Sequence, residues 1–382
     1  MADGQLSTPA SVLPADDRRD RLRLARSRRV GAVTYHRLMA EHGSARAALA
    51  ALPGIAAAAG VAGYEPCPMG VILSEERAGT AAGGRLLVHG EDDYPRALAG
   101  LPDAPPVLWA RGDLSLLNRP AIGMVGARNA SSLGMRMARR LGQALSEAGF
   151  TVISGLARGI DTAAHEAALD GEGRTLAVMA GGIDVIYPAE NEALARLIDE
   201  KGCRISEHPP GLEPQARHFP LRNRIVAGLS RAVIVVEAAT KSGSLITARA
   251  ALDYGRDVMA VPGHPFDARA SGCNMLIRDG AMLVRGPHDV LEALGAPDRG
   301  LPRSVVTAAP PLPGPAVPQR PLKDVALLHS MILSRLGPSP LAEDQLMRDL
   351  EVTSAQLAPE LLNLELEGRI ARQPGGLLAR VD

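Results

Sequence analysis

The chain has 382 residues, of which 46% are hydrophobic and 22% charged, a balance typical of a folded globular protein with two or three domains. Its 42 basic residues are matched by 42 acidic ones, which argues against nucleic-acid binding driven by overall charge. No apolar run approaches the roughly 20 residues of a membrane span, so we expect no membrane contact.

Residues 1–16 lack a basic segment followed by an apolar one, so they are predicted to be a disordered leader and not a secretory signal. The chain has three cysteines and nine histidines. Both kinds of residue are scattered, with no metal-ligand or disulfide spacing. We therefore expect a cytoplasmic protein without a metal or other cofactor.

Helical patterns fill most of residues 17–84. Helices are expected at Asp17–Leu24, Tyr35–His42 and Ala45–Ala51, with turns at Gly31, Gly43-Ser44 and Pro53-Gly54. Nine arginines against four acidic residues lie between positions 16 and 50. A solvated surface and a DNA contact explain this local excess about equally well.

Residues 85–296 alternate between short apolar runs and helical periods. Strands are expected at Ala121–Val125, Thr151–Ser154, Thr175–Ala180, Arg204–Ser206, Ala232–Glu237 and Asp257–Val261. Helices are expected at Gly134–Ala148, Thr162–Leu169, Leu221–Leu229 and Ser244–Tyr254. Near-continuous apolar strands separated by helices predict an α/β domain, with a Rossmann-like parallel sheet covered on both faces.

Residues 297–321 are predicted to be a proline-rich linker, and residues 322–382 a separate small domain. Helices at Lys323–Leu336, Leu341–Leu350 and Ser354–Glu367, followed by a hairpin of Ile370–Arg372 and Leu377–Val381, predict a winged helix. This domain has six basic and nine acidic residues. Since DNA-recognition helices are basic, our hypothesis is that the domain contacts protein or another part of the chain.

The first strand-to-helix loop of the sheet is Gly126-Ala127-Arg128-Asn129. Its glycine permits a close backbone approach, the following helix offers free N–H groups, and Arg128 adds a charge, so the loop is suited to phosphate. An ordinary strand-to-helix turn is an equal alternative. The loop is not a GxGxxG sequence and lacks an acidic residue for a ribose, which disfavours a dinucleotide site.

The second loop is Ser154-Gly155-Leu156-Ala157-Arg158-Gly159, with Asp161 and His165 just beyond it. Asp161 and His165 could form an acid/base pair, but no nucleophile or metal ligand accompanies them. We therefore favour a helix-capping role for Asp161 and a packing role for His165.

The segment from Arg217 to Arg224 gathers three arginines around Phe219. Such a segment suits a clamp on a nucleic-acid backbone, and a charged surface helix is the alternative. Lys241-Ser242-Gly243 forms a further small turn before a helix. Since only 2% of the residues are aromatic, Phe219 and Phe266 are the candidate stacking residues, and binding is expected to be phosphate-dominated and salt-sensitive.

Almost all basic residues are arginines: three of the 42 are lysines, which leaves 39 arginines. A preference for arginine codons explains the overall count. It does not explain the placement of arginines in the loops described above.

The motifs of this sheet domain resemble the DNA-processing protein family DprA, also called Smf. They occur in the family's order and are Val125-Gly126-Ala127-Arg128, Ser154-Gly155-Leu156-Ala157-x-Gly159-Ile160-Asp161-x-x-x-His165, Tyr187-Pro188, Phe219-Pro220-x-Arg222-Asn223-Arg224, Glu237-x-x-x-x-Ser242-Gly243-Ser244, Val261-Pro262-Gly263 and Gly272-x-Asn274-x-Leu276-Ile277-x-x-Gly280-Ala281. Ala127 stands where the family often has serine.

The resemblance implies an extended Rossmann-like domain between a SAM-like helical domain and a winged helix. It also implies a homodimer that binds and protects single-stranded DNA and loads a RecA-type recombinase in natural transformation, with no enzymatic activity. The expected DNA-binding residues are Gly126, Arg128, Asn129, Ser154, Gly155, Arg158, Gly159, Arg217, Phe219, Arg222, Asn223, Arg224, Lys241, Ser242 and Gly243.

The alternative is a nucleotide-binding or nucleoside-monophosphate-hydrolysing enzyme with a Rossmann-like fold. Such enzymes carry a PGGxGTxxE signature. Here Gly181-Gly182 leads to Ile183-Asp184, and no glutamate follows Ser242-Gly243-Ser244, so the sequence favours the DNA-binding hypothesis.

Overall fold

The computed structural model describes residues 13–295, 297, 322–336, 341–350, 352–353, 357, 360–361, 363–365, 369–373 and 377–380. The predicted leader and proline-rich linker lie mostly outside these residues. Contacts group the described residues into two units, one of residues 13–25 and 69–297 and one of residues 26–68 and 322–380. The helices of the predicted 17–84 domain are divided between the units, and the predicted domain bounds stay a prediction.

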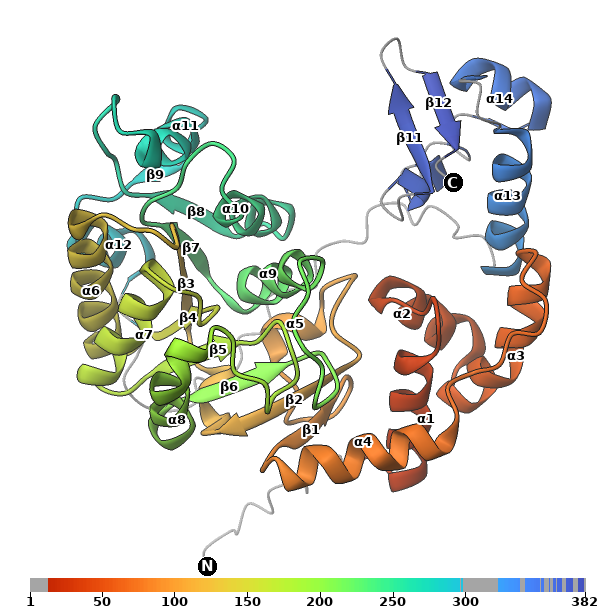
Figure 1. Ribbon diagram of the computed structural model, residues 1–382, viewed down its shortest axis with the longest axis horizontal. Helices are drawn as coiled ribbons and strands as arrows, with labels where there is room; N and C mark the ends of the chain where they lie inside the picture. Colours follow the sequence, from red (N-terminus) through yellow and green to blue (C-terminus); the bar gives the residue numbers. More distant parts are fainter. Residues whose placement is uncertain are drawn as a thin grey trace, which may run out of the picture. The chain divides into compact units, whose positions relative to one another are not determined.

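The first unit is built on a nine-stranded sheet with the order β1-β2-β6-β5-β4-β3-β7-β8-β9 (Figure 1). The strands are β1 (Arg85–Val88), β2 (Val107–Gly112), β3 (Ala121–Val125), β4 (Thr151–Ser154), β5 (Thr175–Val178), β6 (Cys203–Ser206), β7 (Ala232–Val235), β8 (Asp257–Ala260) and β9 (Met282–Leu283). All neighbouring pairs from β6 to β9 are parallel, which confirms the predicted parallel core.

The edge formed by β1 and β2 was not predicted. β1 pairs with β2, and β2 with β6, in antiparallel fashion, so the sheet is mixed. These two strands precede the repeating strand–helix units, and no helical crossover forces them to run parallel to the others. Their apolar side chains are buried like those of the predicted strands.

Helices cover both faces of the sheet (Figure 1). One face carries α6 (Ser132–Glu147), α7 (Ile160–Asp170), α8 (Glu192–Lys201) and α12 (Pro287–Leu294), and the other carries α5 (Arg96–Ala99), α9 (His218–Leu229), α10 (Ser244–Asp253) and α11 (Ser271–Arg278). Along β3, Ile122 and Met124 pack toward α6 and α7 while Ala121 and Val125 pack toward α9 and α10. Alternate side chains of this fully buried strand therefore fill two separate cores. Three short 3₁₀ turns, η1 (Leu114–Asn118), η2 (Ala189–Asn191) and η3 (Ala268–Ala270), complete the unit.

Two N-terminal helices, α1 (Ala15–Arg26) and α4 (Met69–Ala81), belong to the sheet unit. Arg18 of α1 donates to Glu91 at 2.9 Å and to the Leu86 carbonyl of β1 at 2.6 Å. The indole of Trp109 on β2 donates to Glu75 of α4 at 2.9 Å. Both helices are thus fixed to the antiparallel edge by buried polar contacts.

The second unit contains α2 (Ala32–His42), α3 (Ala45–Ala58), α13 (Leu322–Arg335), α14 (Glu343–Leu350), β10 (Leu341–Ala342), β11 (Ile370–Gln373) and β12 (Leu377–Arg380). The predicted turn at Pro53-Gly54 is wrong, because both residues lie inside α3. The alanine-rich stretch after Pro53 has enough helix propensity to continue past the lost hydrogen bond.

The winged helix is as predicted, with the hairpin of β11 and β12 joined by β10 in a three-stranded sheet. Within the predicted helix Ser354–Glu367, residues 357, 360–361 and 363–365 are described and helical. Its core is leucine-rich. Throughout the described ranges, no helix combines the length and apolar character that crossing a bilayer requires.

We expect Glu91→Ala to destabilise the sheet unit by about 2–3 kcal/mol, because Glu91 also accepts the backbone N–H groups of Leu13 and Val88, which would lose this partner. Urea denaturation followed by the fluorescence of Trp109, the chain's one tryptophan, measures this change. Arg85→Ala, which breaks an exposed ion pair with Asp93, is the control and should change stability by less than about 1 kcal/mol. Equal effects of the two substitutions would contradict the anchoring role of Glu91.

Candidate functional site

A pocket of about 210 Å³ lies at the carboxyl ends of β3, β4 and β7, and we call it the switch-point pocket. After β3 the chain builds the sheet outward through β4, β5 and β6, and then returns to add β7 on the other side of β3. Loops on the two sides of such a reversal diverge and leave a crevice, which is where open α/β sheets bind ligands.

The β4–α7 loop is held by the carboxylate of Asp161. Its Oδ2 accepts the N–H groups of Gly155 at 3.1 Å and Ala157 at 3.4 Å. The predicted role of Asp161 as a cap of its own helix is therefore wrong, because the carboxylate turns back onto the preceding loop. Burial raises the pKa of Asp161, and the nearby Arg222 guanidinium opposes that rise.

Arg222 on α9 forms the floor of the pocket. Its side chain donates to the Val178 carbonyl at 2.8 Å and to the amide oxygen of Asn223 at 3.2 Å. A Cβ atom on Gly155 would lie 1.6 Å from Nη1 of Arg222, so glycine is required for this close contact. Burial lowers the pKa of Arg222 while the Asp161 carboxylate raises it. Arg222 and Asp161 thus form a buried charge couple.

Hydrogen bonds tie the remaining loops together. Asn223 donates to the Gly243 carbonyl at 3.3 Å, and Ser244 donates to the Gly126 carbonyl at 2.9 Å. Gly159 has a φ of 75°, and its missing Cβ would lie 2.3 Å from the Ala127 carbonyl oxygen. The loops after β3, β4 and β7 are therefore linked to one another before any ligand binds.

A short aromatic and cationic stack stands at the pocket mouth. The guanidinium carbon of Arg128 lies 5.0 Å from the centre of the Phe219 ring, a cation–π contact. Tyr187 meets the same ring edge-on, with the ring centres 5.8 Å apart. A second small hollow adjoins the first, sharing Arg128 and Phe219 and adding Tyr187 and Arg158.

Eight of the predicted site residues line the switch-point pocket: Gly126, Arg128, Gly155, Phe219, Arg222, Asn223, Ser242 and Gly243. Arg158 lines the adjoining hollow. The remaining predicted residues, Asn129, Ser154, Gly159, Arg217, Arg224 and Lys241, line neither. Of these, Asn129, Arg217 and Lys241 are exposed on the neighbouring surface.

Arg224 and Ser154 have structural contacts instead. Arg224 donates to both carboxylate oxygens of Glu207, at 2.7 and 2.6 Å, and to the Asp103 carbonyl. Burial lowers the pKa of Arg224, but the carboxylates of Glu207 and Asp103 outweigh it and raise the pKa overall. Ser154 is buried and donates to the Met124 carbonyl. Neither side chain is available to a ligand at the pocket.

His165 is a structural residue whose two ring nitrogens are both engaged. Thr175 donates its hydroxyl proton to the Val152 carbonyl, so Nδ1 of His165 donates to the Thr175 oxygen at 2.7 Å. Nε2 then accepts the N–H of Leu156 at 3.3 Å. Burial and Arg222 lower the pKa of His165 to about 3. A neutral ring with no free nitrogen does not serve as an acid/base catalyst.

The N-terminus of α6 already has an anionic partner within the chain, the carboxylate of Glu237. Glu237, at the end of β7, accepts the N–H of Ser131 at 3.0 Å and its hydroxyl at 2.6 Å. The Ser131 hydroxyl in turn accepts the N–H of Gly134 at 3.0 Å, so Ser131 caps the helix. A dinucleotide pyrophosphate would need this helix terminus, so the structure agrees with the sequence in disfavouring that ligand.

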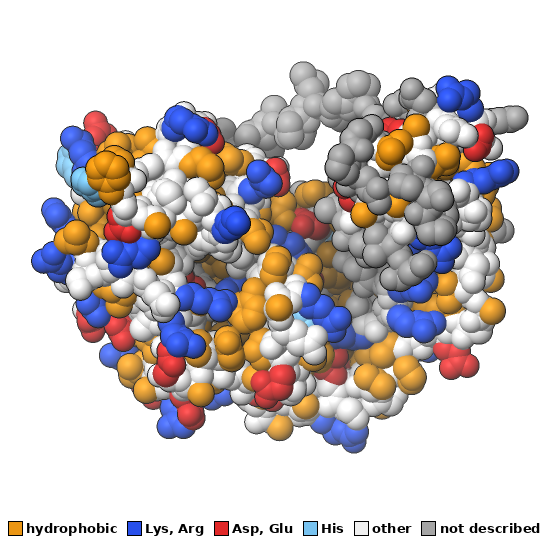
Figure 2. Space-filling model, turned by 45° about the horizontal axis from the view of Figure 1, so that its top comes forward, with side chains coloured by type: hydrophobic (Ala, Val, Ile, Leu, Met, Phe, Trp, Pro, Cys, Tyr) orange, Lys and Arg blue, Asp and Glu red, His pale blue; other side chains and the backbone are white. Residues whose placement is uncertain are grey.

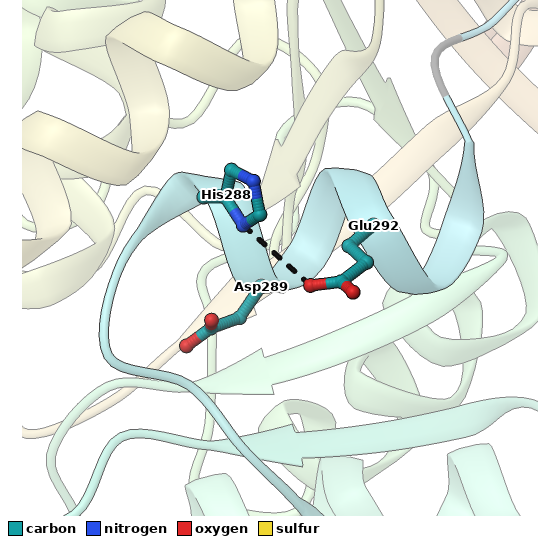
Figure 3. A group of neighbouring side chains, drawn as sticks. All are labelled: His288, Asp289 and Glu292. Atoms are coloured by element: carbon teal, nitrogen blue, oxygen red, sulfur yellow. Dashed lines mark ion pairs between the residues drawn. The ribbon is translucent and has the colours of Figure 1, made fainter.

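A metal site is not apparent near the pocket. Across the described part of the chain, the one group with metal-like spacing is His288, Asp289 and Glu292 on α12. Figure 3 shows the Asp289 carboxylate turned away from the pair of His288 and Glu292. It accepts instead from Arg285, which lowers the pKa of Asp289 to about 2. Both carboxylate oxygens of Asp289 are therefore already hydrogen-bonded and are not free to bind a metal.

The predicted site list lacks eight residues that line the two hollows: Val125, Ala157, Asp161, Tyr187, Pro188, Val226, Ser244 and Thr247. Six of them belong to the motifs that resemble the DprA family, and this membership could have identified them: Val125, Ala157, Asp161, Tyr187, Pro188 and Ser244. Val226 and Thr247 lie outside those motifs, and nothing in the sequence marks them as site residues. Phe266, in contrast, is one of the two predicted stacking residues and lines neither hollow.

Comparison with known proteins agrees with this architecture. The sequence model of DNA recombination-mediator protein A matches residues 85–295. Two further models, a DprA-like N-terminal HHH domain and a DprA winged helix domain, match residues 15–78 and 315–376. The predicted three-part fold is thereby confirmed, with the N-terminal helices described as an HHH domain.

Individual relatives cover most of the chain. Protein Smf of Synechocystis sp. is 38% identical over 313 residues, 76% of this chain and 79% of the relative. The DNA processing protein DprA of Bacillus subtilis is 46% identical over 209 residues, 54% of this chain and 70% of the relative.

Two solved structures share the fold. The X-ray structure of DNA processing protein A from Streptococcus pneumoniae has a TM-score of 0.55 and 34% identity, covering 69% of this chain and 98% of that one. A Helicobacter pylori DNA processing protein A, whose structure concerns its single-stranded DNA binding mode, has a TM-score of 0.51 and 29% identity, covering 55% and 95%.

We expect His165 to make the protein acid-sensitive. The pKa of His165 is about 3 in the folded protein, against an ordinary value of 6.5 for an exposed histidine, so the unfolded chain binds the proton more tightly. Above pH 6.5 the neutral ring of His165 makes its full contribution to the free energy of unfolding. Between pH 6.5 and 3 this free energy falls by about 1.4 kcal/mol per pH unit. His165→Gln, which keeps an acceptor for Leu156, should lower the pH slope of unfolding free energy by one proton, as measured in urea titrations. Equal slopes for the two proteins would contradict a buried neutral ring.

Proposed function

The chain belongs to the DNA recombination-mediator protein A family, the DprA/Smf proteins, and on that premise we propose that it binds single-stranded DNA at the switch-point pocket. The relative from H. pylori is described by its single-stranded DNA binding mode. The proposal extends this binding to the present chain and assigns it to phosphate and stacking contacts around Arg128.

The observation that carries the proposal is the stack of Arg128, Phe219 and Tyr187 between two adjoining hollows. A base can lie against the planar groups, while a phosphate meets the guanidinium of Arg128. The adjoining hollow, of about 20 Å³, is too small for a nucleotide and instead extends the surface beside the pocket. A pocket with a cationic and aromatic edge that continues along the surface suits a flexible strand, whose next nucleotides lie outside the pocket.

Charge at the mouth comes from exposed side chains. Arg128 and Arg158 line the hollows, and Arg217 and Lys241 lie on the flanking surface. Elsewhere, blue and red side chains are interspersed over the face that Figure 2 shows, in keeping with zero net charge. Phosphate binding therefore depends on this local group of cations, and we expect it to weaken with added salt.

The alternative enzymatic hypothesis has less support. Asp161 is occupied by loop amides, His165 is neutral and fully bonded, and the N-terminus of α6 is closed by Glu237. None of these groups is available to activate water or hold a nucleotide phosphate. We therefore propose a DNA-binding role without catalysis.

The proposal includes further properties implied by the family: protection of the strand, loading of a RecA-type recombinase in natural transformation, a cytoplasmic location and a homodimer. A homodimer is compatible with the sheet edge, since β9 is a two-residue edge strand on which Leu283 is partly exposed. Unpaired edges of this kind are common sites of subunit pairing.

Arg128→Ala should weaken oligo-dT binding by about tenfold or more, because it removes a charge-assisted phosphate contact and half of a stack. Loss of one phosphate contact should also reduce the slope of log affinity against log salt by roughly 0.7. Fluorescence anisotropy across a salt series measures both quantities.

Arg139→Ala is the matched control, because Arg139 is an exposed arginine on α6 that pairs with Glu166 and lines neither hollow. It should leave affinity and salt slope unchanged. If Arg128→Ala behaves like this control, the strand does not cross the switch-point pocket.

Glu190→Gln should strengthen oligo-dT binding by about two- to fivefold. Glu190 holds Arg158 in an ion pair of 3.0 Å with both side chains more than half exposed, a pair worth little to folding. Removing this carboxylate frees Arg158 for phosphate and removes a repulsive charge from the mouth. The salt slope should steepen accordingly.

Glu192→Gln provides the control, because Glu192 forms a similar exposed pair with Arg196, which lines neither hollow. An equal gain in affinity from both substitutions would show a general charge effect and no particular role for Arg158.

A further inference from the structure

A second groove, of about 550 Å³, lies on the other side of the β3 loop, between α6 and the segment that follows β8. We call it the α6 groove. It shares no lining residue with the switch-point pocket, and the proposed DNA-binding function does not use it.

The groove is largely apolar. Met137 of α6, Val236 after β7, and Val261 and Pro262 after β8 are among its lining side chains. Leu133, on the α6 wall, is 68% exposed. Close to the opposite wall, Phe266 is 94% exposed and packs only loosely on His264, with the ring centres 5.5 Å apart. Such a cluster of exposed apolar side chains beside a groove is typical of a binding surface.

Two arginines stand on the α6 wall. Arg136 and Arg140 are one helical turn apart, both are exposed, and both line the groove. Among the residues that the structure describes, neither forms a hydrogen bond or an ion pair. The neighbouring Arg139 differs, because it faces Glu166 at 3.8 Å and does not line the groove.

The groove chemistry disfavours a nucleic-acid strand. The N–H groups of Ser131 and Gly134 at the start of α6 are already taken, and the Glu237 carboxylate itself forms part of the wall. A phosphodiester chain carries a charge at every nucleotide and would meet this carboxylate. A peptide can instead place a carboxylate on the arginines and an apolar side chain beside Glu237.

We propose that the α6 groove binds a peptide segment of a protein partner, in which one or two acidic residues adjoin an aliphatic or aromatic anchor. The carboxylates pair with Arg136 and Arg140, and the anchor fills the apolar cleft next to Leu133. Charge complementarity gives the segment its orientation, and apolar burial gives most of its affinity.

The test is a display selection of random 12-residue peptides on the full-length protein. Recovered peptides are expected to combine Asp or Glu with a neighbouring Leu, Ile, Phe or Trp. The strongest one, synthesised with a fluorophore, should bind the Arg136→Glu/Arg140→Glu variant at least tenfold more weakly than wild type. Arg139→Glu should change its affinity less than twofold, and Leu133→Asp should weaken it without altering the arginines.

Oligo-dT binding and Trp109 fluorescence melting are measured on the same variants to detect a lost DNA site or a lost fold. Both should be unchanged. The proposal is overturned if no peptide is enriched, or if selected peptides bind the double variant as they bind wild type. It is also overturned if the double variant loses oligo-dT binding more than Arg139→Glu does, because the groove would then carry DNA. Arg128→Ala tests the switch-point pocket separately.

Discussion

The pocket depends on one buried charge couple, Asp161 and Arg222, each about 6% exposed. Burying both ions is costly, and good geometry with further hydrogen bonds is needed to offset that cost. Asp161 meets the condition by accepting two loop N–H groups, and Arg222 by donating to Val178 at the end of β5. Asp161 therefore fixes the β4–α7 loop and Arg222 fixes α9 to the end of β5, so that these walls of the pocket are held by hydrogen bonds within the fold.

This arrangement separates the structural charges from those available to a ligand. Arg222 and Arg224 are neutralised or engaged within the fold, although the sequence places them beside Phe219 in a single basic segment. Arg128 and Arg158 stay at the surface, one on an aromatic ring and one in a weak exposed pair. Affinity for an anion should consequently follow the surface arginines, while stability follows the buried ones.

Much of the fold could be predicted from the sequence because its signals are local. Ala121–Val125 is a continuous apolar strand that ends in glycine, and its position and parallel pairing are confirmed. The antiparallel strands β1 and β2 could not be predicted in the same way, because their placement depends on pairing with β6, far along the chain. Five of the eight predicted residues that line the pocket lie in loops after β3, β4 and β7, which meet at one edge of the sheet, and the other three lie on α9. The burial of Arg224 could not be predicted, because its partner Glu207 lies 17 residues away on a different loop.

The surfaces on the two sides of the β3 loop suit different ligands, because Glu237 places a carboxylate on the α6 side. By filling the N-terminus of α6, this carboxylate removes the phosphate site that most Rossmann-like folds place there. The proposed phosphate contacts therefore lie on the α9 and α10 side, at the switch-point pocket. The α6 side keeps apolar walls and two arginines that have no ion-pair partner in the described part of the chain, and these suit a different ligand. A single carboxylate thus separates the two surfaces on either side of one strand-to-helix loop, and the proposed DNA strand and the proposed peptide would not compete for the same residues.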